Sequence, residues 1–249
     1  MKITLLQTNI VWNNPEQNCL NATKLIEQNS DTDIFILPET FSTGFATNPE
    51  GIAESNNYSL QWMQKMARAN NVAICGSVAI KDHDNTFRNR LYFVNPDGEV
   101  LFYDKHHLFS LGGEGIHFTN GNERVIVNYK NVRILLQICY DIRFPIFSRN
   151  RNDYDMIIYV ANWPTTRLQA WQTLLHARAI ENQCYVAGVN RCGTDENCEY
   201  SGGTMLIDAY GRTIAECPYN TECSISGNID MNRLNAFRQK FPVLNDADI

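Results

Sequence analysis

Three segments of the sequence place an ionisable or nucleophilic side chain just after a predicted apolar strand. Glu39 follows the run 33–37 (DIFIL), and Cys139 follows the run 132–138 (VRILLQI). Lys105 lies at the end of a predicted hairpin. Open α/β sheets bind ligands at the carboxyl ends of their strands, so the three side chains are candidates for one site. A thiol nucleophile, a carboxylate base and an ammonium that stabilises an oxyanion would together perform acyl transfer.

Each of these residues also has a purely structural explanation when it is taken alone. Glu39 would then be a solvated loop acid or a helix N-cap, and Lys105 would be a surface lysine. Cys139 would be a buried inert thiol, which is also what we expect of the other seven cysteines.

The local context of Cys139 separates it from the other cysteines. The segment 139–145 (CYDIRFP) indicates a sharp turn from a strand into a helix. Backbone N–H groups and the helix dipole at such a turn would stabilise a thiolate, and the same N–H groups would form part of an oxyanion hole. The sequence has no Cys-x-x-Cys motif and no histidine pair at zinc spacing, so no structural zinc site is expected.

Other polar residues could complete the chemistry. Glu114 lies in a glycine-rich stretch and could approach Lys105. A histidine could instead be the base for the thiol, with His106, His107 and His176 as the candidates, although none of them belongs to a supporting motif.

The composition excludes several classes of protein. The chain has 249 residues, of which 44% are hydrophobic, so one domain over residues 1–249 can bury a sizeable core. A net charge of −6 argues against a nucleic-acid binder, which needs a basic surface. No apolar run reaches the ~18 residues of a membrane span. Since residues 1–12 read as a strand and not as an export signal, we expect reduced cysteines and a cytoplasmic protein.

The hydrophobic pattern predicts an α/β fold with two mixed sheets. Short apolar runs bounded by turns predict strands, and wider apolar spacing predicts helices. The expected strands are 2–10, 33–37, 72–80, 90–94, 99–103, 132–138, 156–160, 185–189, 203–207 and 212–216, and the expected helices are 15–29, 60–69, 146–150 and 167–182. Hairpins among these strands exclude a simple doubly wound parallel sheet.

The sequence closely resembles the nitrilase superfamily of carbon–nitrogen hydrolases over essentially its whole length. The resemblance rests on three segments in order, PET (38–40), DKHHLF (104–109) and ICYDIRFP (138–145), and continues through YVANWP (159–164), HARAIENQCYVAGVNR (176–191) and GGTMLIDAYGR (202–212). Within the superfamily, NWPTTR (162–167) and KFPVLNDAD (240–248) look most like bacterial ω-amidases. Those enzymes hydrolyse the terminal amide of 2-oxoglutaramate or 2-oxosuccinamate.

The resemblance implies a four-layer α-β-β-α sandwich, a homodimer and a Glu-Lys-Cys triad that needs no metal or organic cofactor. Glu39 would be the general base, Lys105 the oxyanion stabiliser and Cys139 the nucleophile, with the backbone N–H of Tyr140 as a second oxyanion donor. Glu114 matches a second glutamate that lines such pockets and would orient the substrate amide or Lys105.

A dicarboxylate monoamide also needs a cation for its distal carboxylate, and an arginine suits this geometry. Arg167 is the first candidate and Arg143 the alternative, with Trp163 and Phe45 as possible pocket walls. Three other functions stay open: an amidase for deaminated glutathione or carbamoylated amines, a less favoured nitrile hydrolase, and a catalytically silent binding protein.

Overall fold

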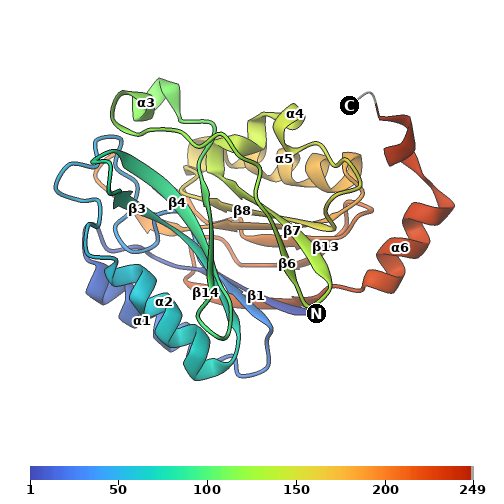
Figure 1. The fold of residues 1–249 in the computed structure, drawn as a ribbon, viewed down its shortest axis with the longest axis horizontal. Helices are drawn as coiled ribbons and strands as arrows, with labels where there is room; N and C mark the ends of the chain where they lie inside the picture. The colour runs from blue at the N-terminus through green and yellow to red at the C-terminus, as the bar shows by residue number, and fades with distance from the viewer. Residues whose placement is uncertain (248–249) are drawn as a thin grey trace.

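Two six-stranded sheets lie face to face in the computed structural model, which describes residues 1–247 (Figure 1). The first sheet contains β1 (Lys2–Gln7), β2 (Ile34–Ile36), β3 (Ala73–Lys81), β4 (Phe87–Val94), β5 (Val100–Asp104) and β14 (Cys223–Asn228), in the order β14-β1-β2-β3-β4-β5. The second contains β6 (Ile126–Tyr129), β7 (Val132–Ile138), β8 (Met156–Ala161), β9 (Tyr185–Asn190), β12 (Met205–Ile207) and β13 (Thr213–Glu216), in the order β13-β12-β9-β8-β7-β6. A small hairpin pairs β10 (Cys192–Thr194) with β11 (Glu199–Ser201).

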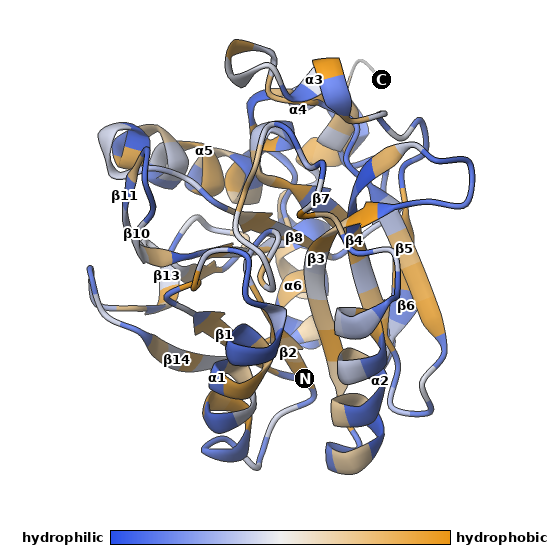
Figure 2. Ribbon diagram, turned by 90° about the vertical axis from the view of Figure 1, so that its left-hand side faces the viewer, coloured by the Kyte–Doolittle hydropathy of each residue, from blue (hydrophilic) through white to orange (hydrophobic). Residues whose placement is uncertain are grey.

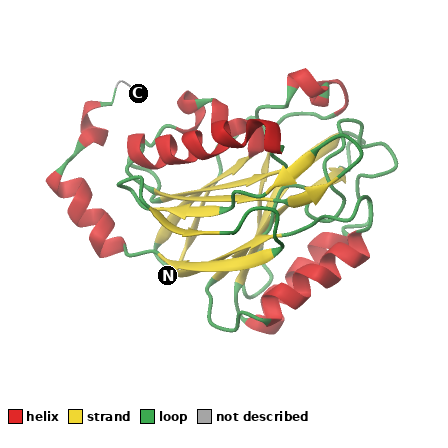
Figure 3. Ribbon diagram, turned by 180° about the vertical axis from the view of Figure 1, so that it is seen from behind, coloured by secondary structure: helices red, strands yellow, loops and turns green. Residues whose placement is uncertain are grey.

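Both sheets are mixed, as the hairpin signals predicted. The central strands β1, β2 and β3 run parallel, and so do β7, β8 and β9, whereas the remaining neighbours are antiparallel. The four long helices are α1 (Pro15–Glu27), α2 (Tyr58–Asn70), α5 (Leu168–Glu181) and α6 (Met231–Lys240), and two short ones are α3 (Glu114–His117) and α4 (Pro145–Ser148). Helices α1 and α2 cover the outer face of one sheet, and α4 and α5 lie outside the other (Figure 3). The predicted α-β-β-α sandwich is confirmed.

Side chains point alternately to the two faces of each sheet, and this explains why four layers form. On β2, Ile34 and Ile36 point into the core between the sheets, while Phe35 packs outward with Cys19 and Ile26 of helix α1. Side chains on successive strand residues point to opposite faces, so a strand that is apolar at every position must be covered on both sides. Figure 2 shows this distribution, with apolar residues concentrated on the strands and polar residues in the loops.

Six strands and α-helices among the described residues were not predicted from the sequence, namely α3, β6, β10, β11, β14 and α6. Most residues of β14 are only half-buried at the sheet edge, and α6 has a single buried residue, Leu234. Without a buried face, neither segment has the apolar periodicity that predicts a strand or helix. The predicted strand 2–10 also ends earlier, at Gln7. Asp248, the last residue of the tail motif, lies outside the described residues.

No helix within residues 1–247 is long and apolar enough to span a membrane. Over the same residues, histidine, cysteine, aspartate and glutamate side chains form no group of three or more that could hold a metal ion.

Candidate active site

The carboxyl ends of β2, β5 and β7 deliver three of the predicted site residues to one cavity of about 680 Å³. Glu39 follows β2, while Lys105 and Cys139 are the first residues after β5 and β7. All three line the cavity, although Glu39 and Lys105 are 66 positions apart in the sequence. Because β2 and β5 belong to one sheet and β7 to the other, the cavity lies where the two sheets end together.

Lys105 is held as an ammonium between two glutamates. Its side chain is 1% exposed, and Nζ lies 2.9 Å from Oε1 of Glu39 and 3.0 Å from both carboxylate oxygens of Glu114. Burial by itself would lower the pKa of Lys105, but the charges of Glu114 and Glu39 outweigh it and raise this pKa. A fixed positive charge is therefore available at the cavity wall.

The carboxylate of Glu39 is fixed through both of its oxygens. Oε1 accepts hydrogen bonds from Nδ2 of Asn89, at 2.8 Å, and from Lys105. Oε2 accepts one from the backbone N–H of Asn162, also at 2.8 Å. Neither asparagine was predicted from the sequence, although the segment YVANWP places Asn162 directly after β8, beside the other strand ends. These partners hold an acceptor at a defined place next to the cysteine.

Glu114 is fully buried and lies behind Lys105. It also accepts the backbone N–H of Phe109. Burial raises the pKa of Glu114, and the charge of Lys105 opposes that shift. Although the sequence analysis expected Glu114 to line the pocket, the cavity lining in residues 1–247 does not include it, so its contact is with Lys105 and not with the substrate space.

Cys139 sits on a strained turn. It has φ 46°, in the left-handed region, and it begins the 3₁₀-helix η2 (Cys139–Arg143) directly after β7. A non-glycine residue in this conformation costs roughly 1–3 kcal/mol, and such turns expose a nucleophile at the edge of a sheet. The predicted turn is therefore present, but the helix that follows it is short.

The expected stabilisation of a Cys139 thiolate is wrong. Burial, followed by the charge of Glu39, raises the pKa of Cys139 well above its usual range, and Lys105 opposes this only in part. The reason is the free energy of ionisation. Ionising a desolvated thiol beside a carboxylate costs more free energy than the dipole of one short helical turn contributes to stabilising the thiolate. The raised pKa favours the protonated thiol of Cys139.

The predicted substrate-binding residues lie around the same cavity. The cavity lining includes all five of them, namely Phe45, Tyr140, Arg143, Trp163 and Arg167. The Arg167 guanidinium lies 5.5 Å from the ring of Phe109, and that of Arg143 lies 5.0 Å from the ring of Trp163. Within residues 1–247, neither guanidinium has a carboxylate partner at ion-pair distance, so both positive charges face the cavity unneutralised.

The histidine alternative has no geometric support. His176 on α5 contacts the carbonyl of Gly211 through Nδ1, and His106 contacts the carbonyl of Gly121. His107 contacts the carboxylate of Asp141. Among the described residues, no histidine lines the cavity that contains Cys139.

One wall of the cavity comes from the β10–β11 hairpin, to which the sequence analysis assigned no role. The residues that line the cavity from this side are Asp195, Asn197, Cys198 and Tyr200. The hydroxyl of Tyr200 donates a hydrogen bond to Oδ2 of Asp195 at 2.8 Å. The hairpin gave no signal in the sequence because its loop is a short polar stretch without a recognisable motif.

A family model described as carbon–nitrogen hydrolase matches residues 2–239. The chain belongs to the carbon–nitrogen hydrolase family. The resemblance to this superfamily predicted from the sequence is thus confirmed, and so is the assignment of the chain as a hydrolase.

Several relatives of this carbon–nitrogen hydrolase match it over nearly their full lengths. The omega-amidase YafV of Escherichia coli (strain K12) is 43% identical, over 100% of this chain and 97% of the relative. The 2-oxoglutaramate amidase of Bacillus subtilis (strain 168) is 34% identical, over 98% of this chain and 96% of the relative. The structure of XC1258 from Xanthomonas campestris, a CN-hydrolase superfamily protein with an arsenic adduct in its active site, matches with a TM-score of 0.96 and 38% identity, over 100% of this chain and 97% of that one.

Proposed function

We propose that this carbon–nitrogen hydrolase cleaves the terminal amide of a small 2-oxo dicarboxylate monoamide, 2-oxoglutaramate or 2-oxosuccinamate, to the acid and ammonia. The observation that carries the proposal is the cavity that unites Cys139, Glu39 and Lys105 with Arg143 and Arg167, neither of which forms an ion pair within residues 1–247. The relatives named omega-amidase and 2-oxoglutaramate amidase support the same substrate class.

In the first half of the proposed reaction, Glu39 takes the thiol proton of Cys139 while Sγ attacks the amide carbon. Because Cys139 rests as a thiol, this proton transfer accompanies the attack. Lys105 and the backbone N–H of Tyr140 stabilise the oxyanion of the tetrahedral intermediate. The protonated Glu39 then gives its proton to the leaving nitrogen, the C–N bond breaks, and ammonia leaves a thioester on Cys139.

In the second half, water hydrolyses the thioester. Glu39 takes a proton from the water as its oxygen attacks the carbonyl carbon, and the C–S bond then breaks. The released sulfur recovers its proton from Glu39, which restores the starting state. Glu114 acts in neither step and keeps the Lys105 ammonium in place throughout.

Arg167 is the proposed partner of the distal carboxylate of the substrate, with Trp163 and Phe45 as walls of the pocket. The indole Nε1 of Trp163 donates to the backbone carbonyl of Arg167 at 2.7 Å, which fixes the start of the segment that carries this guanidinium. A guanidinium without a protein carboxylate can bind the substrate carboxylate through two hydrogen bonds.

The direct test is ammonia release by the wild-type protein from 2-oxoglutaramate, glutamine and an uncharged aliphatic amide. We expect the highest kcat/KM for 2-oxoglutaramate, because only that substrate offers both the carboxylate and the 2-oxo group for which the pocket is proposed. A deaminated glutathione amide, a carbamoylated amine and a nitrile complete the panel. If one of these three compounds had the highest kcat/KM of the panel, the proposed substrate class would be overturned. If no amide released ammonia, the result would indicate a silent binding protein.

Arg167→Ala is expected to raise KM for 2-oxoglutaramate by about ten- to a hundredfold, which corresponds to the loss of a charge-assisted contact of about 1.5–3 kcal/mol. KM and kcat for the uncharged amide should stay close to the wild-type values. Steady-state kinetics with both substrates measure this difference. Arg143→Ala is the matched variant, since Arg143 lines the same cavity. Equal losses of kcat/KM for charged and uncharged amides in Arg167→Ala would show that Arg167 does not bind the distal carboxylate.

We also propose that the chain is one catalytic domain that forms a homodimer through α4 and α5. Ile146 on α4 and Ile180 on α5 are 72% and 54% exposed. The two helices are neighbours, because Arg149 donates to the backbone carbonyl of Glu181 at 2.7 Å. Burial of both isoleucines against a second copy would remove apolar surface from water. Sedimentation equilibrium would contradict the dimer if it gave a single species of about 28.5 kDa at all concentrations.

A cytoplasmic location is proposed on the state of the cysteines. All eight are free thiols in the structure, including those of Cys217 and Cys223, whose Sγ atoms lie 2.7 Å apart, and free thiols are expected in a reducing compartment. Titration of the freshly isolated, denatured protein should detect all eight thiols, and recovery of disulfide-bonded protein from cells would contradict this location.

A further inference from the structure

Asp141 receives four hydrogen bonds although it is fully buried. Its Oδ1 accepts from the backbone N–H of His107 at 2.9 Å and from Nδ1 of the same residue at 2.8 Å. Its Oδ2 accepts from the hydroxyl of Tyr103 at 2.8 Å and from the backbone N–H of Ile138 at 2.9 Å. The carboxylate does not line the cavity, so the proposed reaction does not use it.

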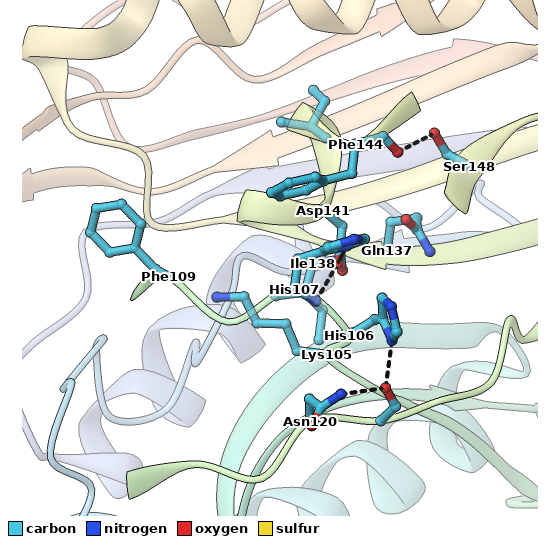
Figure 4. A network of polar contacts seen from close by, with 12 residues as sticks. Lys105, His106, His107, Phe109, Asn120, Gln137, Ile138, Asp141, Phe144 and Ser148 are labelled. Atoms are coloured by element: carbon cyan, nitrogen blue, oxygen red, sulfur yellow. Dashed lines mark hydrogen bonds and ion pairs between the residues drawn. The ribbon is translucent and has the colours of Figure 1, made fainter. Parts of the chain in front are cut away.

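The donors to Asp141 come from the two segments that carry the reacting groups. Tyr103 and His107 flank Lys105 at the end of β5, in the first sheet. Ile138 is the last residue of β7, in the second sheet, and directly precedes Cys139. Figure 4 shows Asp141 beside Ile138, at the end of β7, and beside His107, on the segment that carries Lys105.

Further contacts fix the positions of Tyr103 and His107 beside Asp141. The Tyr103 hydroxyl, while donating to Asp141, accepts the backbone N–H of His106 at 3.0 Å. The ring of His107 stacks on Phe144, with centroids 3.9 Å apart and planes inclined by 7°. Since His107 Nδ1 faces a carboxylate that only accepts, this nitrogen carries a hydrogen. Every partner of the carboxylate is therefore a donor.

We propose that Asp141 is a positioning residue, which locks the Lys105 ammonium and the strained Cys139 turn into reacting alignment across the two sheets. The bond from Ile138 N–H to Oδ2 closes the turn that forces Cys139 to positive φ. The bonds from Tyr103 and His107 fix the backbone on both sides of Lys105. The inference rests on the proposed function, because it concerns the alignment of the same reacting groups.

Asp141→Asn is the first test. An asparagine presents two N–H donors where the carboxylate had an acceptor, so two of the four partners lose their acceptor and face another donor. We expect kcat for 2-oxoglutaramate to fall by about a hundredfold, the size of loss that small misplacement of reacting groups produces, with KM little changed. Alkylation of Cys139 by iodoacetamide, followed by mass spectrometry, should slow as well, because Lys105 no longer lies in place to favour the thiolate.

Asp155→Asn is the matched control. Asp155 is likewise buried, and it accepts four hydrogen bonds, three from Arg133 at 3.1, 3.0 and 2.8 Å and one from Arg238 at 2.7 Å. It directly precedes β8 and so lies at the opposite end of that strand from the cavity. Its substitution should lower the melting temperature and leave kcat and the alkylation rate unchanged. Equal behaviour of the two variants, with kcat preserved in both, would overturn the positioning role of Asp141.

Two substitutions of His107 keep the inference testable if Asp141→Asn fails to fold. His107→Asn retains a side-chain N–H donor without the ring, whereas His107→Phe retains the stack on Phe144 without the donor. We expect His107→Asn to keep the larger kcat; the reverse order would show that the stacked ring matters and the bond to Asp141 does not. Because alkylation of Cys139 needs no substrate, it separates a failure of this inference from a wrong substrate class.

Discussion

Cys139→Ala is expected to lose turnover of 2-oxoglutaramate by about 10⁴- to 10⁶-fold, as enzymes do when a covalent nucleophile is removed. Without Sγ no thioester can form, and the remaining Glu39 and Lys105 can only polarise the amide and activate water. The melting temperature should stay close to that of the wild type, because the half-buried side chain lies at the wall of a cavity and leaves little new void. Ammonia release and thermal unfolding measure the two quantities.

Cys198→Ala is the control for this variant. Cys198 is also half-buried and lines the same cavity, on the β10–β11 hairpin. Its substitution should leave kcat within the range of the wild-type protein. Loss of turnover in Cys198→Ala with activity kept in Cys139→Ala would reassign the nucleophile.

Lys105→Met has the second largest expected effect, and it changes stability as well as rate. The substitution removes the cation that is proposed to stabilise the oxyanion, and it leaves the buried carboxylates of Glu39 and Glu114 without their shared partner. Breaking a buried ion pair in this way lowers the free energy of unfolding by about 3–5 kcal/mol. Lys2→Met, which breaks the exposed pair of Lys2 with Asp31, should lower it by less than about 1 kcal/mol.

The stability loss of Lys105→Met should depend on pH. Burial already holds the pKa of Glu114 above its unfolded value, and the charge of Lys105 opposes that rise together with the hydrogen bonds from the Phe109 backbone N–H and from Lys105. Without Lys105, this folded-state pKa rises further, so the folded protein loses stability as the pH increases above the unfolded pKa of the carboxyl. The difference from the wild type should be largest near about pH 7.5 and smaller near about pH 5. Urea unfolding at both pH values tests this, and a difference that grows as the pH falls would contradict it.

The convergence of the proposed reacting groups on one cavity was predictable from the sequence, because strand ends mark these residues. Glu39, Lys105 and Cys139 each follow an apolar strand, and parallel strands bring their carboxyl ends to one edge. The resemblance of the ordered segments to the family then restricted the chemistry. The same reasoning applies to Trp163 and Arg167, which follow β8 and line the same cavity.

The supporting groups were not predictable, because their roles depend on contacts between distant segments. Asn89 holds Glu39 across 50 positions of sequence, and Asp141 binds Tyr103 across 38. A carboxylate two residues after Cys139 gives no signal in the sequence that Tyr103 and His107, at the end of a strand in the other sheet, are among its partners. The direction of the Cys139 pKa shift was missed for the same reason, since burial and the charge of Glu39 exist only in the folded chain.

The measurement that tests the central claim most directly is mass spectrometry of the protein acid-quenched during turnover of 2-oxoglutaramate. We expect an acyl adduct on the peptide that contains Cys139, formed with release of ammonia and lost when the substrate is exhausted. No adduct should form on any of the other seven cysteines. Steady turnover with an adduct on a different thiol, or on no cysteine while Cys139→Ala remains active, would contradict the account.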